Sequence, residues 1–131
     1  MINPDIFKAY DIRGRYPEEL NERVVSEIAG VLTRYFKKGK IVLGHDSRLS
    51  SPALYAAFVK VFEKEKKFVL EKVGMLTTPM LYFLVHDLKA SGGVVVTASH
   101  SPKEYNGLKA VGPKAVMISG KDIYGLSSAL R

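Results

Sequence analysis

The residues whose types could do chemistry lie in one stretch that follows an apolar run. Val94–Val96 is followed by the segment Thr97–Pro102 (TASHSP), and Lys109 comes ten residues after Ser99. If the apolar run is a strand, Ser99 lies just after its C-terminal end, which is the edge where open α/β sheets bind ligands. A hydroxyl nucleophile, the imidazole of His100 and an ammonium group are then within reach of one loop.

This arrangement does not indicate a hydrolase triad. Adjacent side chains of an extended loop point apart, no acid partner is evident, and no G-x-S-x-G elbow surrounds Ser99. The stretch suits better a serine that stores a phosphoryl group, because phosphoserine carries roughly −1.5 to −2 charges and strong acceptor oxygens. His100, Lys109 and Arg13 are the donors available. Each also has a structural interpretation; Arg13, for example, could simply pair with Asp11 or Asp46.

Three motifs, in order along the chain, carry a family resemblance. The segment 97–109 resembles the pattern T-A/G-S-H-N-P followed by Y/D-N-G-x-K, with Ser101 departing from the usual Asn. The segment 7–14 (FKAYDIRG) resembles the N-terminal motif F-K-A-Y-D-I-R-G of the same family. The segment 44–48 (GHDSR) is similar to its pattern G-x-D-x-R before a helix. Together they resemble the α-D-phosphohexomutase family, the phosphomannomutase and phosphoglucomutase enzymes.

The resemblance implies a reaction. In the family, the serine that matches Ser99 holds a phosphate and transfers it to a hexose monophosphate, which gives a bisphosphorylated sugar. The intermediate turns over in the site, and the serine recovers a phosphate from the other position. The net change is the interconversion of hexose 1-phosphate and hexose 6-phosphate.

The resemblance also implies roles for individual residues. Ser99, His100, Lys109 and Arg13 are the expected catalytic residues, and Tyr10, Arg13 and Lys109 are the expected substrate contacts. Catalysis of phosphoryl transfer is mainly positioning and charge stabilisation, which Arg13 and Lys109 would supply. A Mg²⁺ ion would bind the phosphate on Ser99. The family's aspartate ligands for that ion, in a D-G-D-x-D-R cluster, are not in this sequence.

The resemblance places residues 1–131 as a single α/β domain, similar to the N-terminal, phosphoserine-bearing domain of a four-domain enzyme. The family's sugar-discriminating loop and C-terminal phosphate-binding loop are also absent, so the sequence does not predict which hexose is preferred. Whether the chain is a fragment or stands alone is left open. We expect the isolated chain to be inactive, with a phosphorylated hexose as substrate and the missing domains as partners in cis or in trans.

The composition limits which other classes of protein this chain can belong to. A chain of 131 residues with 47% hydrophobic and 25% charged residues fits about one globular domain. No apolar run approaches the ~18 residues of a membrane span, and the start is not typical of a signal peptide. Cysteine is absent, which excludes disulfides and thiolate metal sites. We therefore expect a cytoplasmic protein without a membrane partner.

The net charge of +7 suits an anionic ligand. The densest basic run, 60–72, interleaves three glutamates and is typical of a solvated helix end. No helix-turn-helix, aromatic stacking motif or localised basic stripe is evident, so we expect no nucleic-acid partner.

Hydrophobic spacing predicts alternating strands and helices. Helices are predicted over 21–37, 51–66 and 78–88, and strands over 6–10, 40–43, 68–73, 94–97, 108–111 and 115–118. Ser51 is the expected N-cap of the second helix, with Pro52 at its first position. Asn106-Gly107 is expected to form a tight turn with positive φ. The alternation predicts a mostly parallel sheet with helices on both faces, and the resemblance implies a three-layer α/β/α sandwich with a mixed sheet.

Two other functions compete with a mutase domain. One is a non-catalytic phosphosugar- or protein-binding module that keeps the fold without turnover, which the missing loops favour for the isolated chain. The other is a basic nucleic-acid-binding domain. A phosphate on Ser99, detected by mass spectrometry, distinguishes the mutase domain from both.

Overall fold

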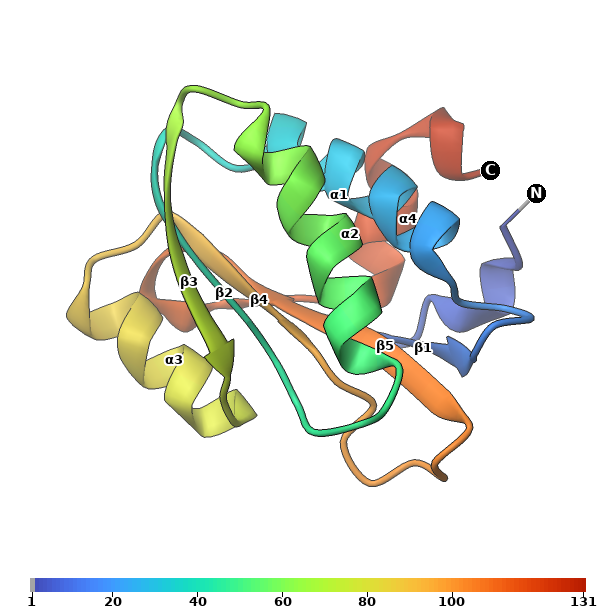
Figure 1. Cartoon of the computed structure of the whole chain (residues 1–131). Helices are drawn as coiled ribbons and strands as arrows, with labels where there is room; N and C mark the ends of the chain where they lie inside the picture. The colour runs from blue at the N-terminus through green and yellow to red at the C-terminus, as the bar shows by residue number, and fades with distance from the viewer. Residues whose placement is uncertain (1) are drawn as a thin grey trace.

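A six-stranded sheet lies between two layers of helices in the computed structural model, which describes residues 2–131 (Figure 1). The strands are β1 (Ile12–Arg15), β2 (Gly39–His45), β3 (Phe68–Met75), β4 (Gly92–Val96), β5 (Tyr105–Val111) and β6 (Met117–Ile118). The α-helices are α1 (Glu22–Tyr35), α2 (Ser51–Glu63), α3 (Thr78–Asp87) and α4 (Gly120–Leu126), and the 3-10 helices are η1 (Pro4–Ile6), η2 (Pro113–Ala115) and η3 (Ser128–Leu130). The predicted three-layer sandwich is confirmed.

The sheet is mixed, with the strand order β1–β5–β4–β2–β3 and β6 beside β5. β2 pairs in parallel with β3 and β4, whereas β5 is antiparallel to β1, β4 and β6. Five of the six strands therefore run in one direction, and β5 opposes them. Two of the five pairings are parallel and three antiparallel, because the one reversed strand has three neighbours.

The apolar run that precedes Ser99 is a central strand buried on both faces. Val94 and Val96 pack into the larger core beneath α1 and α2, and Val95 packs into the smaller core beneath α3. A strand that is covered on both sides needs apolar residues at every position, which explains why β4 shows no polar alternation. Figure 1 shows α1, α2 and α4 on one side of the sheet and α3 on the other.

Polar N-cap residues precede α1, α2 and α3, but the N-cap of α2 differs from the predicted residue. The side chain of Asn21 accepts from the Val24 amide at the start of α1, and Thr77 accepts from the Met80 amide at the start of α3. The N-cap of α2 is Ser50 rather than Ser51, and its side chain makes no capping bond. Ser51 is instead fully buried and its hydroxyl donates to Asp46. None of the helices within residues 2–131 is long and apolar enough to cross a bilayer.

The predicted strand over 6–10 is wrong. Residues Pro4–Ile6 form η1, Phe7 makes a single bridge to Ile12, and the first strand begins only there. Asn3 accepts from the Asp5 amide, and Pro4 follows it at the first helical position. This local helix start outweighs the short apolar pattern that had indicated a strand.

Asn106 and Gly107 do not form the predicted turn, because both lie inside β5. The side-chain nitrogen of Asn106 donates to the hydroxyls of Ser50 and Ser51 at the start of α2, and its Oδ1 accepts from the Gly107 amide. Gly107 pairs with Arg13 of β1, and a Cβ there would overlap the carbonyl oxygen of Ile12. The glycine is therefore required for close approach of two backbones rather than for a positive φ.

Gly107→Ala should lower the free energy of unfolding by about 3 kcal/mol, because β1 and β5 must separate to admit the new Cβ. Gly125→Ala is the matched control: a Cβ there meets nothing within 4 Å, so stability should stay constant or rise slightly. Urea unfolding of both variants measures the difference. Equal stability of the two would contradict the close approach.

Candidate active site

A basic cleft of about 1040 Å³ opens where β2, β3 and β4 end. Its lining comes from the last residue of β3 and the segments that follow these three strands, with one residue each from β1 and β5. The residues that line it are Arg13, Asp46, Ser47, Arg48, Met75, Leu76, Thr77, Thr78, Pro79, Thr97, Ser99, His100, Ser101, Lys103 and Lys109. This is the carboxyl edge of the parallel strands, where the sequence predicted a ligand site.

The charges in the cleft are mostly positive. Arg13, Arg48, Lys103 and Lys109 line it, and Asp46 is the one acidic residue among the lining residues within 2–131. An ion pair with Arg48 (3.4 Å) already engages that carboxylate. The cleft therefore favours an anionic ligand.

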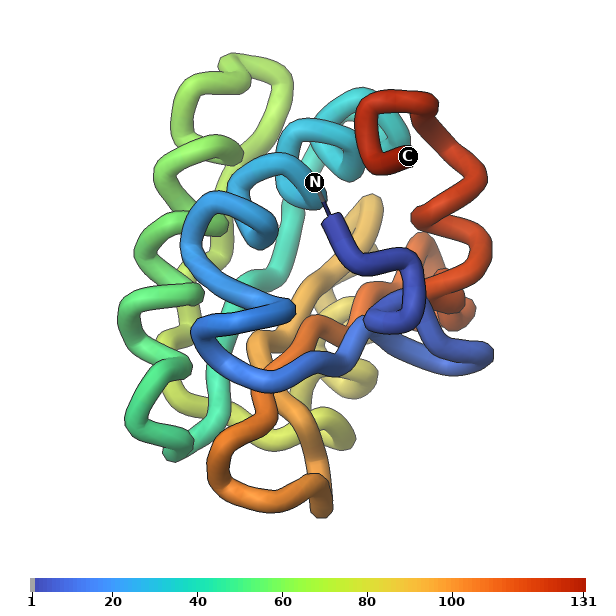
Figure 2. Tube along the Cα trace, turned by 90° about the vertical axis from the view of Figure 1, so that its right-hand side faces the viewer, coloured from blue at the N-terminus to red at the C-terminus, as the bar shows by residue number. Residues whose placement is uncertain are grey.

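Ser99 lies in the loop between β4 and β5, which projects from the end of the sheet opposite the two chain ends (Figures 1 and 2). Its φ of 54° is in the left-handed region, which a residue with a Cβ rarely adopts. The turn is closed by the Ser101 amide, which donates to the Ala98 carbonyl at 3.0 Å. The Ser99 amide donates to Thr97 Oγ1 at 3.0 Å. The predicted position of Ser99, in a loop directly after a central strand, is confirmed.

Asp46 connects this loop to the start of α2. Its carboxylate accepts from the hydroxyls of Ser51 and Thr97 and from the Arg48 amide. Burial acts to raise the pKa of Asp46, but these hydrogen bonds and the Arg48 charge outweigh it and hold the pKa below its usual value. Asp46 therefore braces the turn between β2 and α2 and joins it to the Ser99 loop.

Asp46→Asn should lower the free energy of unfolding by about 1–3 kcal/mol at pH 7. Because the folded-state pKa lies below the unfolded one, the carboxylate stabilises the fold above about pH 4, and this contribution is lost as the pH falls through the folded pKa. The gap between wild type and variant should therefore narrow at pH 3, as urea unfolding at both pH values measures. Asp87→Asn, which changes an exposed carboxylate, is the control. An equal gap at both pH values would contradict the role of the charge.

Arg48 binds the backbone of the Ser99 loop in addition to its ion pair with Asp46 in its own turn. Its Nη2 donates to the carbonyls of Ser99 (2.9 Å) and Ser101 (2.7 Å), and its Nη1 donates to those of Pro102 (2.7 Å) and Tyr105 (3.1 Å). Sequence reasoning missed this role. The G-x-D-x-R spacing singles out the residue, but its partners lie 51 to 57 positions away along the chain.

Arg13 and Lys109 both line the cleft with Ser99, although they lie far apart in the sequence. Arg13 donates from Nη1 to Ser101 Oγ (3.0 Å) and from Nη2 to Asp11 (2.7 Å), and its Nε is buried without a partner within residues 2–131. Lys109 projects from β5, opposite Val95 of β4. Both cations thus line the same cleft as Ser99, and their catalytic roles stay predictions.

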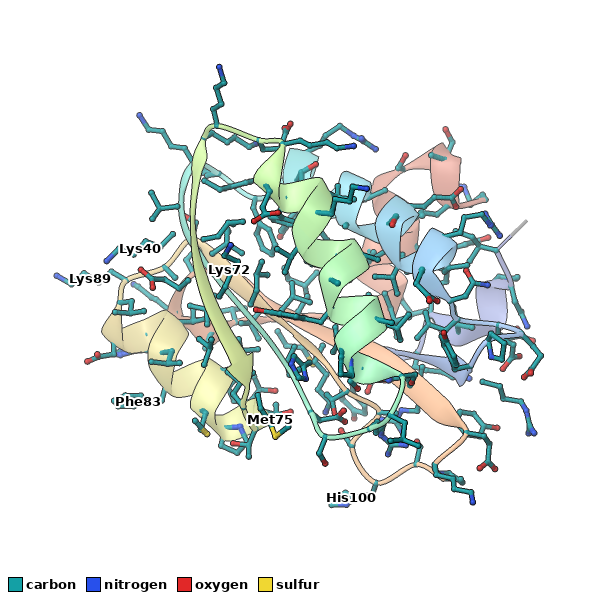
Figure 3. The ribbon with its side chains drawn as sticks, in the orientation of Figure 1. Lys40, Lys72, Met75, Phe83, Lys89 and His100 are labelled. Atoms are coloured by element: carbon teal, nitrogen blue, oxygen red, sulfur yellow. The ribbon has the colours of Figure 1, made fainter. Side chains whose placement is uncertain are left out.

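His100 and Tyr10 lie in different places. His100 is exposed at the outer end of the loop and lines the cleft (Figure 3). Tyr10 is not part of the cleft lining, and its side chain is 70% exposed. The bend that carries Tyr10 is held by Lys8, which donates to the Asp11 carbonyl and accepts from the Lys121 amide of α4. The role of Tyr10 as a substrate contact stays a prediction.

The described residues do not form a metal site by themselves. Within residues 2–131 no group of three or more histidine, aspartate or glutamate side chains could hold a metal ion. Asp46, the carboxylate in the cleft, is already engaged by Ser51, Thr97 and Arg48. Any magnesium ion would therefore need ligands other than these side chains.

Comparisons with known proteins agree on one family. A family model for phosphoglucomutase/phosphomannomutase, alpha/beta/alpha domain I, matches residues 4–130. The chain is 48% identical over 113 residues to phosphohexose mutases of Xanthomonas campestris, covering 86% of this chain and 25% of that protein. It is 44% identical over 133 residues to a phosphomannomutase of Salmonella montevideo, covering 98% of this chain and 29% of that protein.

Solved structures give the same result. The crystal structure of a phosphoglucomutase/phosphomannomutase family protein from Burkholderia thailandensis matches with a TM-score of 0.80 and 34% identity, over 96% of this chain and 30% of that chain. A putative phosphomannomutase from Thermus thermophilus matches with a TM-score of 0.83 and 29% identity, over 100% of this chain and 31% of that chain. The chain thus spans about a quarter to a third of the length of these relatives.

Proposed function

Because the chain belongs to the phosphoglucomutase/phosphomannomutase family, as its alpha/beta/alpha domain I, we propose that it is the phosphoserine-bearing domain of a phosphohexomutase. The observation that carries the proposal is the position of Ser99, in a left-handed turn at the edge of a basic cleft that Arg13 and Lys109 also line. The substrate would be a hexose monophosphate. A cytoplasmic setting, inferred from the absence of cysteine, is part of the proposal.

The proposed reaction is a pair of phosphoryl transfers. The bond between phosphorus and Ser99 Oγ breaks, and a bond to a hydroxyl oxygen of the hexose monophosphate forms. The sugar hydroxyl gives up its proton, and the serine oxygen regains one. The bisphosphorylated sugar then returns the phosphoryl group at its other position to Ser99, which completes the interconversion of 1-phosphate and 6-phosphate.

The residues of this chain would contribute positioning and charge. Arg13 and Lys109 would stabilise the charge of the transferring group and are candidates for proton transfer at the sugar oxygen. His100 would contact phosphate or sugar hydroxyls. Magnesium, which neutralises phosphate charge when bound, would be held by the phosphate on Ser99 together with ligands other than the side chains of residues 2–131.

Incubation of the whole enzyme that carries this domain with a hexose 1,6-bisphosphate, followed by mass spectrometry, tests the proposal. We expect a phosphate on Ser99 in that enzyme. The purified 131-residue chain should show no measurable conversion of hexose 1-phosphate to hexose 6-phosphate, because the loops that hold metal and distal phosphate are not in this sequence. Ser99→Ala is the control and should remain unmodified.

Two other outcomes would count against the proposal. Saturable binding of hexose phosphate without any phosphate on Ser99 would favour the non-catalytic binding module. Salt-sensitive binding of oligonucleotides would favour a nucleic-acid domain.

A further inference from the structure

Both sides of the Ser99 backbone are connected to one segment, the turn between β2 and α2, the carbonyl directly and the amide through Thr97. On its amide side, the Ser99 N–H donates to Thr97 Oγ1, and that hydroxyl donates to Asp46 at 2.7 Å. On its carbonyl side, Ser99 accepts from Arg48 Nη2 at 2.9 Å. Asp46 and Arg48 are themselves ion-paired. The conformation of the serine is thus coupled to a pair of charges on another loop.

We propose that Arg48 is a positioning residue for phosphoryl transfer, which holds the Ser99–His100 peptide so that the His100 amide donates to the phosphoryl group on Ser99. The inference rests on the proposed function, because it requires a phosphate on Ser99. It assigns a backbone donor and a distinct task to a residue that has no hydrogen bond to the Ser99 side chain.

The geometry of the peptide supports this assignment. In a trans peptide the C=O and the following N–H point in opposite directions. Since the Ser99 carbonyl points at the Arg48 guanidinium, the His100 N–H points away from it. Within residues 2–131 no backbone or side-chain acceptor binds that N–H. It is a free donor one residue from the proposed phosphate carrier.

The peptide needs such a restraint because its conformation is unfavourable. Ser99 is the first central residue of the turn from Ala98 to Ser101, and its φ of 54° is one that glycine normally supplies at this position. A serine there has a Cβ that opposes the left-handed conformation. The two bonds from Arg48 Nη2, to the Ser99 and Ser101 carbonyls, stabilise the turn on either side of His100.

The task also explains why an arginine is needed. One planar guanidinium binds four carbonyls of a single loop and keeps its Nε on Asp46, with the side chain only 14% exposed. The ammonium of a lysine carries three donors on one nitrogen, so it cannot reach five acceptors arranged around a fork. Arg48→Lys therefore keeps the charge and removes the geometry.

The first test measures the amide directly. In ¹⁵N–¹H spectra of the 131-residue chain carrying phosphoserine at position 99, the His100 amide should shift downfield relative to the unphosphorylated chain. The shift should be lost in Arg48→Lys and retained in the matched control Arg23→Ala, which removes an exposed arginine of α1. Absence of the shift in the wild type, or its persistence in Arg48→Lys, would overturn the inference. Resonances of β2 and β4 report whether each variant is folded.

The second test uses the whole enzyme that carries this domain. Arg48→Lys should lower kcat about 100-fold with little change in KM, because small displacements of a reacting group cost this much. Arg23→Ala should leave both unchanged. If Ser99→Ala is inactive but Arg48→Lys has normal kcat, the inference fails while the proposed function stands. If Ser99→Ala stays active, the proposed function itself fails.

Discussion

Ser99→Ala should abolish phosphoryl transfer by the enzyme that carries this domain, with a loss of at least about 10⁴-fold, while leaving the fold intact. The variant has no carrier for the phosphate, so the covalent route is closed rather than slowed. Within residues 2–131 the Ser99 hydroxyl makes no hydrogen bond, so its removal breaks none. Serine and alanine also share a Cβ, so the left-handed φ brings no new strain.

Transfer assays with a hexose monophosphate and urea unfolding of the same preparations measure the two effects. The free energy of unfolding should change by no more than about 0.5 kcal/mol. Ser26→Ala, which changes a serine of α1 outside the cleft, should keep full activity. Transfer that persists in Ser99→Ala, with contaminating enzyme excluded, would remove the basis of the proposed function.

The position of Ser99 could be predicted from the sequence because it depends on the residues next to it in the chain. Val94–Val96 is apolar at every position because the strand is buried on both faces, so the residues that follow it must emerge at the edge of the sheet. That edge is where Ser99 lies. The starts of α1 and α3 were predictable for the same reason. The side chains of Asn21 and Thr77 cap these helices by accepting from backbone amides only three residues later.

Other predictions failed where distant contacts override local signals. Asn106-Gly107 has the sequence of a tight turn, but the Asn106 amide is satisfied by Ser50 and Ser51, and Gly107 is required by the backbone of β1. The carbonyl partners of Arg48 could not be predicted either, because they depend on how the two loops meet in space. Such contacts exist only once the chain has folded.

The two cations beside Ser99 should respond differently to replacement. Within residues 2–131 no ion pair or hydrogen bond engages the Lys109 ammonium, so it is available to a ligand. Lys109→Ala should therefore lower the rate of transfer about 10²- to 10³-fold, as expected for a group that stabilises transition-state charge, and change stability by less than about 1 kcal/mol. Transfer kinetics and urea unfolding of one preparation check both numbers.

Arg13→Ala should lower the transfer rate to a similar extent and also destabilise the fold, against the simple expectation that a basic surface residue matters little for folding. Its partner Asp11 has a side chain only 2% exposed, so the variant leaves a buried carboxylate without its counter-charge. The expected loss is about 1–3 kcal/mol. The double variant Asp11→Asn with Arg13→Ala removes the orphaned charge, so it should recover much of the stability and none of the rate. If activity returned together with stability, Arg13 would serve the fold alone, and the charge that stabilises the transferring phosphoryl group would have to come from Lys109 and the loop amides.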